Sequence, residues 1–287
     1  MRQDYRPEID VSPELGTKDT QLYQQLIGML RWACELGRVD ILYEVSLLST
    51  HLALPREGHL EAAFGVFAYL NKHEDLVLVC DPKPVRIDPN AFIATDWSES
   101  VHGDITEELP SKALEPMGRG VTMTCLVDAS HAGDLSTRRS HTSYIIYLNN
   151  APIVFYSKKQ NTVESSTFGS EIVALRSAME AVRSLRIKLR LLGIPLEGPT
   201  NVLCDNDAVV KSTSRAEARL NKKHQAICWH AIRESCAAGW LRIGKEDGET
   251  NTADLFTKSL SPEKRRQLLL QIFVKGGAAE TNETEED

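Results

Sequence analysis

The sequence has no long apolar run. No stretch of its 287 residues approaches the ~20 consecutive apolar residues that a membrane-spanning helix needs. The first ten residues, MRQDYRPEID, also lack the apolar core of a secretion signal. We therefore expect an intracellular protein with no membrane partner.

The sequence is also poor in closely spaced cysteines. Its six cysteines are scattered and form no Cys-x-x-Cys pair, which argues against a disulfide scaffold and against a zinc ribbon. The spacing of His224, Cys228 and His230 is not that of a familiar closed zinc site either. We expect reduced thiols and no zinc.

The chain as a whole has no excess of basic residues: its formal net charge is −7. The charge is unevenly distributed, however. Residues 1–120 hold 11 basic against 20 acidic side chains, residues 121–275 hold 22 against 15, and residues 276–287 hold none against 5. The basic middle suits a polyanion site, although a solvated basic face would have the same composition.

The sequence pattern of the N-terminal third predicts a small helical unit. We expect a flexible entry segment over residues 1–19 and helical patterns over 20–37, 41–52 and 55–72, followed by a short strand at 76–80. This places a helical unit at 20–80. Residues 81–120, with several prolines and many acids, are expected to be a linker.

The sequence pattern of the basic region predicts a mixed α/β domain over residues 121–273. Strands are expected at 121–128, 142–149, 152–157, 201–205 and 240–246, and helices at 164–193, 206–214, 223–238 and 251–273. This order predicts a mixed five-stranded sheet flanked by helices. The acidic residues 274–287 are expected to be a disordered tail.

Two of the predicted strands end on an aspartate, Asp128 and Asp205, and chemistry in α/β sheets tends to lie at such strand ends. Glu171 lies on the apolar stripe of the long helix, so its carboxylate should point toward the sheet. Asp254 lies in the first turn of the last predicted helix, where an acid is also ordinary helix-dipole complementation.

Four converging carboxylates would need cations to neutralise them. Oxygen ligands suit Mg²⁺ or Mn²⁺, and two such ions can hold the attacking and leaving oxygens of a phosphoryl displacement. A carboxylate pocket in a basic domain therefore fits a phosphodiesterase that acts on a nucleic acid.

The motifs themselves resemble a known family. The segments LVDASHAGD, RRSHTSY, FYSKKQNTVESSTFGSEIVAL, LCDNDAVV, KKHQAICWHAIRE and NTADLFTK resemble the ribonuclease H domain at the end of copia-type LTR-retrotransposon Pol polyproteins. Residues 23–70 resemble the thumb and connection region that follows the reverse-transcriptase palm in those polyproteins. The resemblance implies a ribonuclease H-like fold preceded by a helical thumb/connection unit.

The family's four catalytic carboxylates fall on Asp128, Glu171, Asp205 and Asp254. The resemblance implies that all four bind two Mg²⁺ ions, with Mn²⁺ as a substitute. Asp128 and Asp205 would bridge the ions, Glu171 would serve the ion on the leaving-group side, and Asp254 the ion that holds the attacking water. The implied reaction is cleavage of the RNA strand of an RNA–DNA hybrid, with 2′-hydroxyl contacts from Glu171 and Asn206.

A basic and polar group near these carboxylates is expected to follow the phosphate backbone of the nucleic acid. Its members are Lys158, Lys159, Gln160, Asn206, Arg219, Lys222, Lys223 and His224. A solvated face is the alternative interpretation for the basic residues at 219–224 and for Lys158 and Lys159. The large aromatics, Trp32 among them, lie within apolar patterns and are expected to pack in the core.

The chain departs from the family at Ser130 and His131, where Trp or a second Asp is frequent, and near Gly169, where another acid is frequent. It also contains no Asp-Asp dipeptide, so no complete polymerase site is expected. Three functions stay open: a two-metal ribonuclease H, a catalytically idle hybrid-binding remnant, and a nuclease that acts on DNA or branched substrates. The rest of a Pol polyprotein is a possible partner, and the retrotransposon context implies a cytoplasmic particle or the nucleus.

Overall fold

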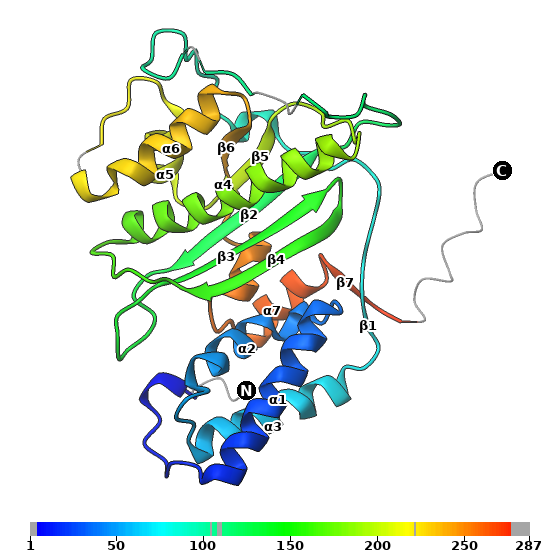
Figure 1. Ribbon diagram of the computed structural model, residues 1–287, viewed down its shortest axis with the longest axis vertical. Coiled ribbons are helices and arrows are strands. Elements are labelled where there is room, and N and C mark those ends of the chain that lie inside the picture. The colour runs from blue at the N-terminus through cyan, green and yellow to red at the C-terminus, as the bar shows by residue number, and fades with distance from the viewer. Residues whose placement is uncertain (1–4, 104, 108–110, 221, 277–287) are drawn as a thin grey trace, which may run out of the picture.

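The computed structural model describes residues 5–103, 105–107, 111–220 and 222–276 of the chain (Figure 1). One large sheet crosses the middle of the molecule. Three helices cover one face of this sheet, and the N-terminal helices together with the C-terminal segment lie against the other (Figure 1). Within these described ranges, no helix combines the length and the apolar character that crossing a membrane requires.

The central sheet has five strands in the spatial order β4-β3-β2-β5-β6. β2 (Met123–Ser130), β3 (His141–Leu148) and β4 (Ala151–Lys159) are antiparallel, whereas β5 (Thr200–Cys204) and β6 (Leu241–Lys245) run parallel to β2. The predicted mixed five-stranded sheet flanked by helices is thus confirmed. The parallel connections pass through helices, as parallel strand pairs require.

Both faces of this sheet are buried, because successive side chains of a strand point to opposite sides. Ile146 packs in the cluster under α4 (Thr167–Leu191), α5 (Asp207–Ser214) and α6 (Ala226–Ala237), while its neighbour Ile145 packs in a cluster with the C-terminal segment. Helix α4 is capped at its N-terminus by Ser166, whose hydroxyl accepts a hydrogen bond of 3.2 Å from the Gly169 amide. It is followed by Gly193 at a φ of 73°, the left-handed conformation that glycine adopts most readily after a helix.

The N-terminal helices form their own core and dock on the second face of the sheet. α1 (Thr17–Glu35), α2 (Leu42–Leu48) and α3 (Glu57–Lys72) surround buried Tyr23, Ile27 and Leu30. The Tyr23 hydroxyl donates a hydrogen bond of 2.7 Å to the Leu48 carbonyl. Helix α2 contacts β4, so the helical unit and the sheet domain share one interface.

The end of the chain differs from the single long helix expected over 251–273. Thr252–Phe256 form a short 3-10 turn, α7 runs over Pro262–Leu269, and β7 over Phe273–Lys275. Pro262 explains the break, because the residue before a proline is disfavoured in the helical conformation and proline itself begins helices well. Ser261 caps α7 by accepting a hydrogen bond from the Lys264 amide.

The expected segment boundaries also shift. Residues 5–16, expected to be flexible, pack on α3, where His59 Nε2 lies 2.9 Å from the Pro7 carbonyl oxygen. At the other end, β7 pairs with β1 (Leu76–Leu78) in a two-stranded antiparallel sheet, so Val274 and Lys275 are part of a strand and not of a disordered tail. Residues 277–287 of the expected tail lie outside the described residues.

The segment 81–120 has only one short 3-10 turn, at Pro89–Ala91, among its described residues. It is nevertheless held against the domain by an ion pair. Glu107 of this segment contacts Arg186 of α4, with 2.8 Å between Oε2 and Nη2, and the same carboxylate lies 3.0 Å from Arg190 Nη2. Arg186 is buried, and its guanidinium also donates to the Gly198 carbonyl. The segment is therefore anchored to α4.

Candidate active site

Two of the four carboxylates come from neighbouring parallel strands. Asp128 lies near the end of β2, and Asp205 directly follows β5. The register pairs Leu126 with Leu203, so the two aspartates sit two residues further along each strand at the same edge of the sheet. Asp128 is 1% exposed, whereas Asp205 is half-buried.

Asp254 reaches the same place from the 3-10 turn at Thr252–Phe256. Asn251 caps this turn, with its Oδ1 accepting a hydrogen bond of 3.0 Å from the Ala253 amide. Ser143 of β3 donates a hydrogen bond of 2.7 Å to the Ala253 carbonyl, which fixes the turn to the sheet. Asp128, Asp205 and Asp254 each offer a carboxylate oxygen within 4.8 Å of the others.

Glu171 approaches this cluster from α4. It is buried on the stripe that also carries Ala174 and Leu175. Burial, together with the charges of Asp128 and Asp205, raises its pKa well above the usual value of a glutamate. Among the described residues its Oε2 has no hydrogen-bond partner although it is buried. A buried carboxylate oxygen without a partner is costly unless a proton or a cation binds it.

The electrostatics of the cluster favour a cation. Burial raises the pKa of Asp128 to about 6, and the charges of Asp254 and Asp205 add to that rise, while Lys258 and the Thr257 hydroxyl oppose it. The Thr257 hydroxyl donates to Asp128 Oδ2. Hard oxygen donors that repel one another and lie at one edge of a sheet are the ligands that Mg²⁺ and Mn²⁺ prefer, so the residues fit such ions.

Two lysines outside the predicted set of site residues also contact the cluster. Lys258 Nζ lies 2.8 Å from Asp254 Oδ1 and 3.3 Å from Asp128 Oδ1. Lys264 Nζ lies 3.2 Å from Asp254 Oδ2. The sequence carried a signal for the first of them, because Lys258 stands four residues after Asp254 in NTADLFTK.

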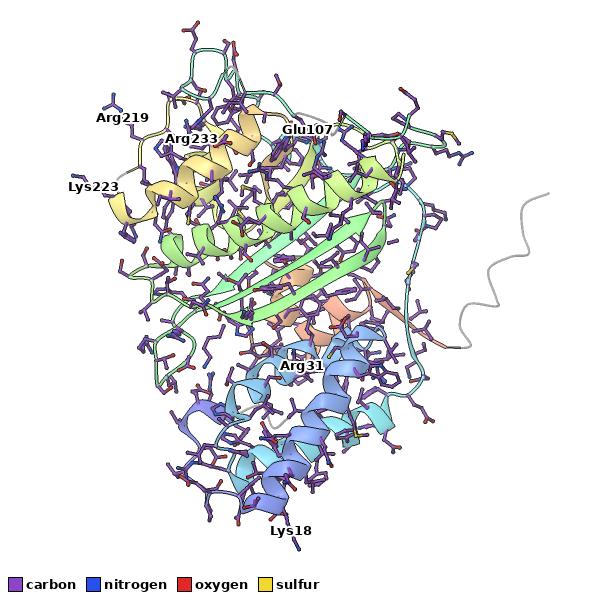
Figure 2. All side chains as sticks on the ribbon, in the orientation of Figure 1. Lys18, Arg31, Glu107, Arg219, Lys223 and Arg233 are labelled. Atoms are coloured by element: carbon purple, nitrogen blue, oxygen red, sulfur yellow. The ribbon has the colours of Figure 1, made fainter. Side chains whose placement is uncertain are left out.

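The expected nucleic-acid contacts divide into exposed and internal residues. Arg219 and Lys223 are exposed and point away from the molecule at the connection between α5 and α6 (Figure 2). His224 is exposed beside Lys223, and its Nε2 lies 3.5 Å from Glu164 Oε2. Lys158 is exposed on β4. Lys222 is half-buried and donates to the Ser166 hydroxyl.

The remaining three expected contacts have structural partners. Gln160 is buried, and its amide donates hydrogen bonds of 2.9 Å to Thr142 Oγ1 and to the Ser170 carbonyl, so it is not part of the exposed group. Lys159 forms an ion pair with Asp134. Asn206 caps α5 through its Oδ1.

The chain is similar to retrovirus-related Pol polyproteins over most of its length. It is 28% identical over 256 residues to the retrovirus-related Pol polyprotein from transposon RE1 of Arabidopsis thaliana, covering 87% of this chain and 15% of that polyprotein. It is 25% identical over 245 residues to the corresponding polyprotein from transposon TNT 1-94 of Nicotiana tabacum, covering 85% of this chain and 16% of the relative. No protein-family model matches the chain.

These matches confirm the resemblance to retrotransposon Pol polyproteins, and the chain spans about 15% of the length of the first of these relatives. Similarity to solved structures extends over about half of the chain. The N-terminal RNase H domain of a Mycobacterium tuberculosis protein aligns with a TM-score of 0.37 at 11% identity, covering 53% of this chain and 98% of that one. LC11-RNase H1, solved in complex with an RNA/DNA hybrid, aligns with a TM-score of 0.39 at 14% identity, covering 47% and 94%.

Proposed function

From its homology to retrovirus-related Pol polyproteins, we propose that this chain is a ribonuclease H that cleaves the RNA strand of RNA–DNA hybrids with two divalent ions. The observation that carries the proposal is the convergence of Asp128, Asp205 and Asp254 within 4.8 Å, with a buried Glu171 whose pKa is raised by burial and by the charges of Asp128 and Asp205. Bound Mg²⁺ would stabilise the negative charge that develops on the scissile phosphate.

The chain's own residues have distinct tasks in this proposal. Asp128 and Asp205 would hold both ions, Glu171 the one on the leaving-group side, and Asp254 the one on the side of the attacking water. The Asn251 cap and the Ser143 hydrogen bond keep the Asp254 turn against the sheet, so little reorganisation is needed when ions bind.

Substrate choice would depend on groups beside the cluster. The Oδ1 atom of Asn206 is committed to the cap of α5, and within the described residues its Nδ2 has no hydrogen-bond partner, which leaves a donor for a 2′-hydroxyl. Exposed Arg219 and Lys223 would contact phosphates and add affinity that depends on salt.

The test compares the parent chain with Asp205→Asn on a hybrid whose RNA strand is end-labelled, in Mg²⁺ and separately in Mn²⁺. We expect the parent to cleave only the RNA strand, and Asp205→Asn to lose at least about 100-fold in rate. Asp207→Asn is the matched control, because Asp207 is an exposed aspartate on α5 that pairs with Lys211.

Two other results would point to the alternatives. Tight binding of the hybrid without cleavage in either ion would indicate a catalytically idle remnant. Cleavage of an all-DNA duplex at the rate of the hybrid would indicate a nuclease of broader substrate range.

A further inference from the structure

One side chain already occupies a cation position in the carboxylate cluster. The ammonium of Lys258 bridges Asp254 and Asp128, at 2.8 Å and 3.3 Å from one oxygen of each. The Lys258 side chain is 35% exposed, whereas both aspartates are almost fully buried. A partly exposed cation is thus paired with two buried anions.

The other lysines near the cluster do not make this bridge. Lys264 contacts Asp254 through the other oxygen, Oδ2, and also donates a hydrogen bond of 2.8 Å to the Gly248 carbonyl. Lys245 donates to the main-chain carbonyl of Asp205 and has no ion pair with a carboxylate among the described residues. Lys258 is therefore the lysine whose position overlaps that of a bridging cation.

The overlap has a chemical consequence. Mg²⁺ and Mn²⁺ bind carboxylate oxygens at about 2.0–2.2 Å, and an ammonium held at hydrogen-bond distance from the same oxygens would be repelled by such an ion. The oxygens of Glu171 and Asp205 are not paired with Lys258. One side of the cluster is thus free for an ion, and the other side is shared with a lysine.

We propose that Lys258 is an internal competitor for the second metal position: it neutralises Asp128 and Asp254 when that position is empty and leaves them when the second ion binds. The proposal rests on the proposed metal-dependent function of the same cluster. The proposal implies that the two ions bind with different affinities. The first ion binds without displacing a side chain, and the second ion must displace Lys258.

The structure gives the displaced side chain a place to go. A cavity of about 240 Å³ lies beside the cluster, and Lys258 forms part of its wall together with Ser130 of β2. Tyr43 and His51 of the helical unit also line this cavity. In the proposal, the displaced side chain of Lys258 turns into this space.

The test measures Mn²⁺ binding by electron paramagnetic resonance in the absence of substrate. We expect two affinities in the parent, and Lys258→Gln should tighten the weaker one by about tenfold or more because its competing charge is gone. Lys258→Arg keeps a cation and should bind like the parent. Lys245→Gln is the matched control, because it removes the same charge near the same site without touching a carboxylate.

The outcomes separate this proposal from the proposed function. Equal tightening by Lys258→Gln and Lys245→Gln would overturn it, because a general change in charge would then explain the result. If Asp205→Asn abolishes Mn²⁺ binding but Lys258→Gln leaves both affinities unchanged, the lysine proposal alone is wrong. If neither the parent nor Lys258→Gln binds Mn²⁺, both proposals are wrong. Thermal unfolding in EDTA checks that each variant is folded.

Discussion

Asn251 joins the Asp254 turn to the strand that carries Asp128: its Nδ2 donates a hydrogen bond of 3.0 Å to the Val127 carbonyl, one residue before Asp128. The same side chain caps the turn through its Oδ1. One buried amide therefore fixes the relative position of two carboxylates that are 126 residues apart in the sequence.

Replacement of Asn251 by alanine should weaken the site without removing a ligand. The Val127 carbonyl and the Ala253 amide would each lose a buried partner, at a cost of about 1–3 kcal/mol in unfolding free energy. We expect Mn²⁺ affinity to fall about 10- to 100-fold, as for other residues that orient metal ligands. Urea unfolding and Mn²⁺ titration measure the two effects.

Asn90→Ala serves as the control for this substitution. Asn90 is exposed, and among the residues that the structure describes its side chain donates a hydrogen bond to Asp88 and to no other residue. Unchanged Mn²⁺ affinity in Asn251→Ala would show that Asp254 is held by other contacts.

His141 should make the fold sensitive to acid. It is buried between Ser157, whose Oγ lies 2.8 Å from His141 Nε2, and the ring of Tyr43. Burial, and then the charge of Lys159, lower its pKa to about 3. Because the folded state disfavours the protonated imidazole, the stabilisation is complete above pH 6.5 and is lost as the pH falls from 6.5 toward 3.

When the pH falls from 7 to 5, the unfolding free energy of the parent should decrease by about 2 kcal/mol more than that of His141→Gln. The difference arises because unfolding of the parent lets His141 take up one proton in this pH range. Urea unfolding at the two pH values measures the difference. His230→Gln, at an exposed histidine, should lose as much stability as the parent. Parallel pH curves for the parent and His141→Gln would contradict the assignment.

Arg265 of α7 should hold the helical unit on the sheet domain. Its Nη1 lies 2.6 Å from Glu44 Oε1 of α2, and its Nη2 donates to the Asp40 carbonyl. Arg265→Met leaves the buried carboxylate of Glu44 unpaired, which should cost about 3 kcal/mol. Hydrogen exchange in α2 should accelerate more than exchange in α4.

The control for Arg265→Met is Arg31→Met on the exposed face of α1 (Figure 2). It should leave both stability and exchange unchanged. Equal acceleration of exchange in α2 and α4 by Arg265→Met would mean that the arginine stabilises the whole molecule and not this interface.

Arg219 and Lys223 should contribute to hybrid affinity through phosphates. The double replacement Arg219→Ala and Lys223→Ala should weaken binding at low salt and reduce the slope of log affinity against log salt by about 2, one unit for each lost phosphate contact. Fluorescence anisotropy at several salt concentrations measures the slope. Lys18→Ala, at the far end of the molecule on α1, is the control (Figure 2). An unchanged slope would mean that the two side chains form only a solvated face.

The sequence predicted the parts of the molecule that depend on local pattern. Alternating and β-branched residues locate all five strands of the central sheet, and the end of β5 locates Asp205. The sequence also predicts a strand that ends on Asp128, whereas β2 continues to Ser130, so Asp128 lies two residues before the end of its strand. Glu171 was found because a carboxylate on an apolar stripe is conspicuous. These features need no knowledge of distant contacts.

Features that depend on distant contacts were missed. Trp32 belongs to an apolar pattern and was expected in the core, yet it is 66% exposed, because α1 buries the stripe of Tyr23, Ile27 and Leu30 instead. The position of Lys258 is set by the turn that replaces the expected last helix. The docking of α2 on β4 depends on partners more than one hundred residues away, such as Ser46, whose hydroxyl donates a 2.9 Å hydrogen bond to the Ser157 carbonyl.

The pairing of β1 with β7 brings the end of the helical unit next to the segment that follows the sheet domain. Residues 76–78 and 273–275 are neighbours, so the sheet domain lies within one loop that begins and ends at the helical unit. A single protease cut in the segment 81–120 would therefore yield two fragments that stay associated, and the sheet domain separated at residue 121 would leave β7 without its partner strand. The strand that completes the small sheet with β1 thus comes from the end of the chain, after the sheet domain.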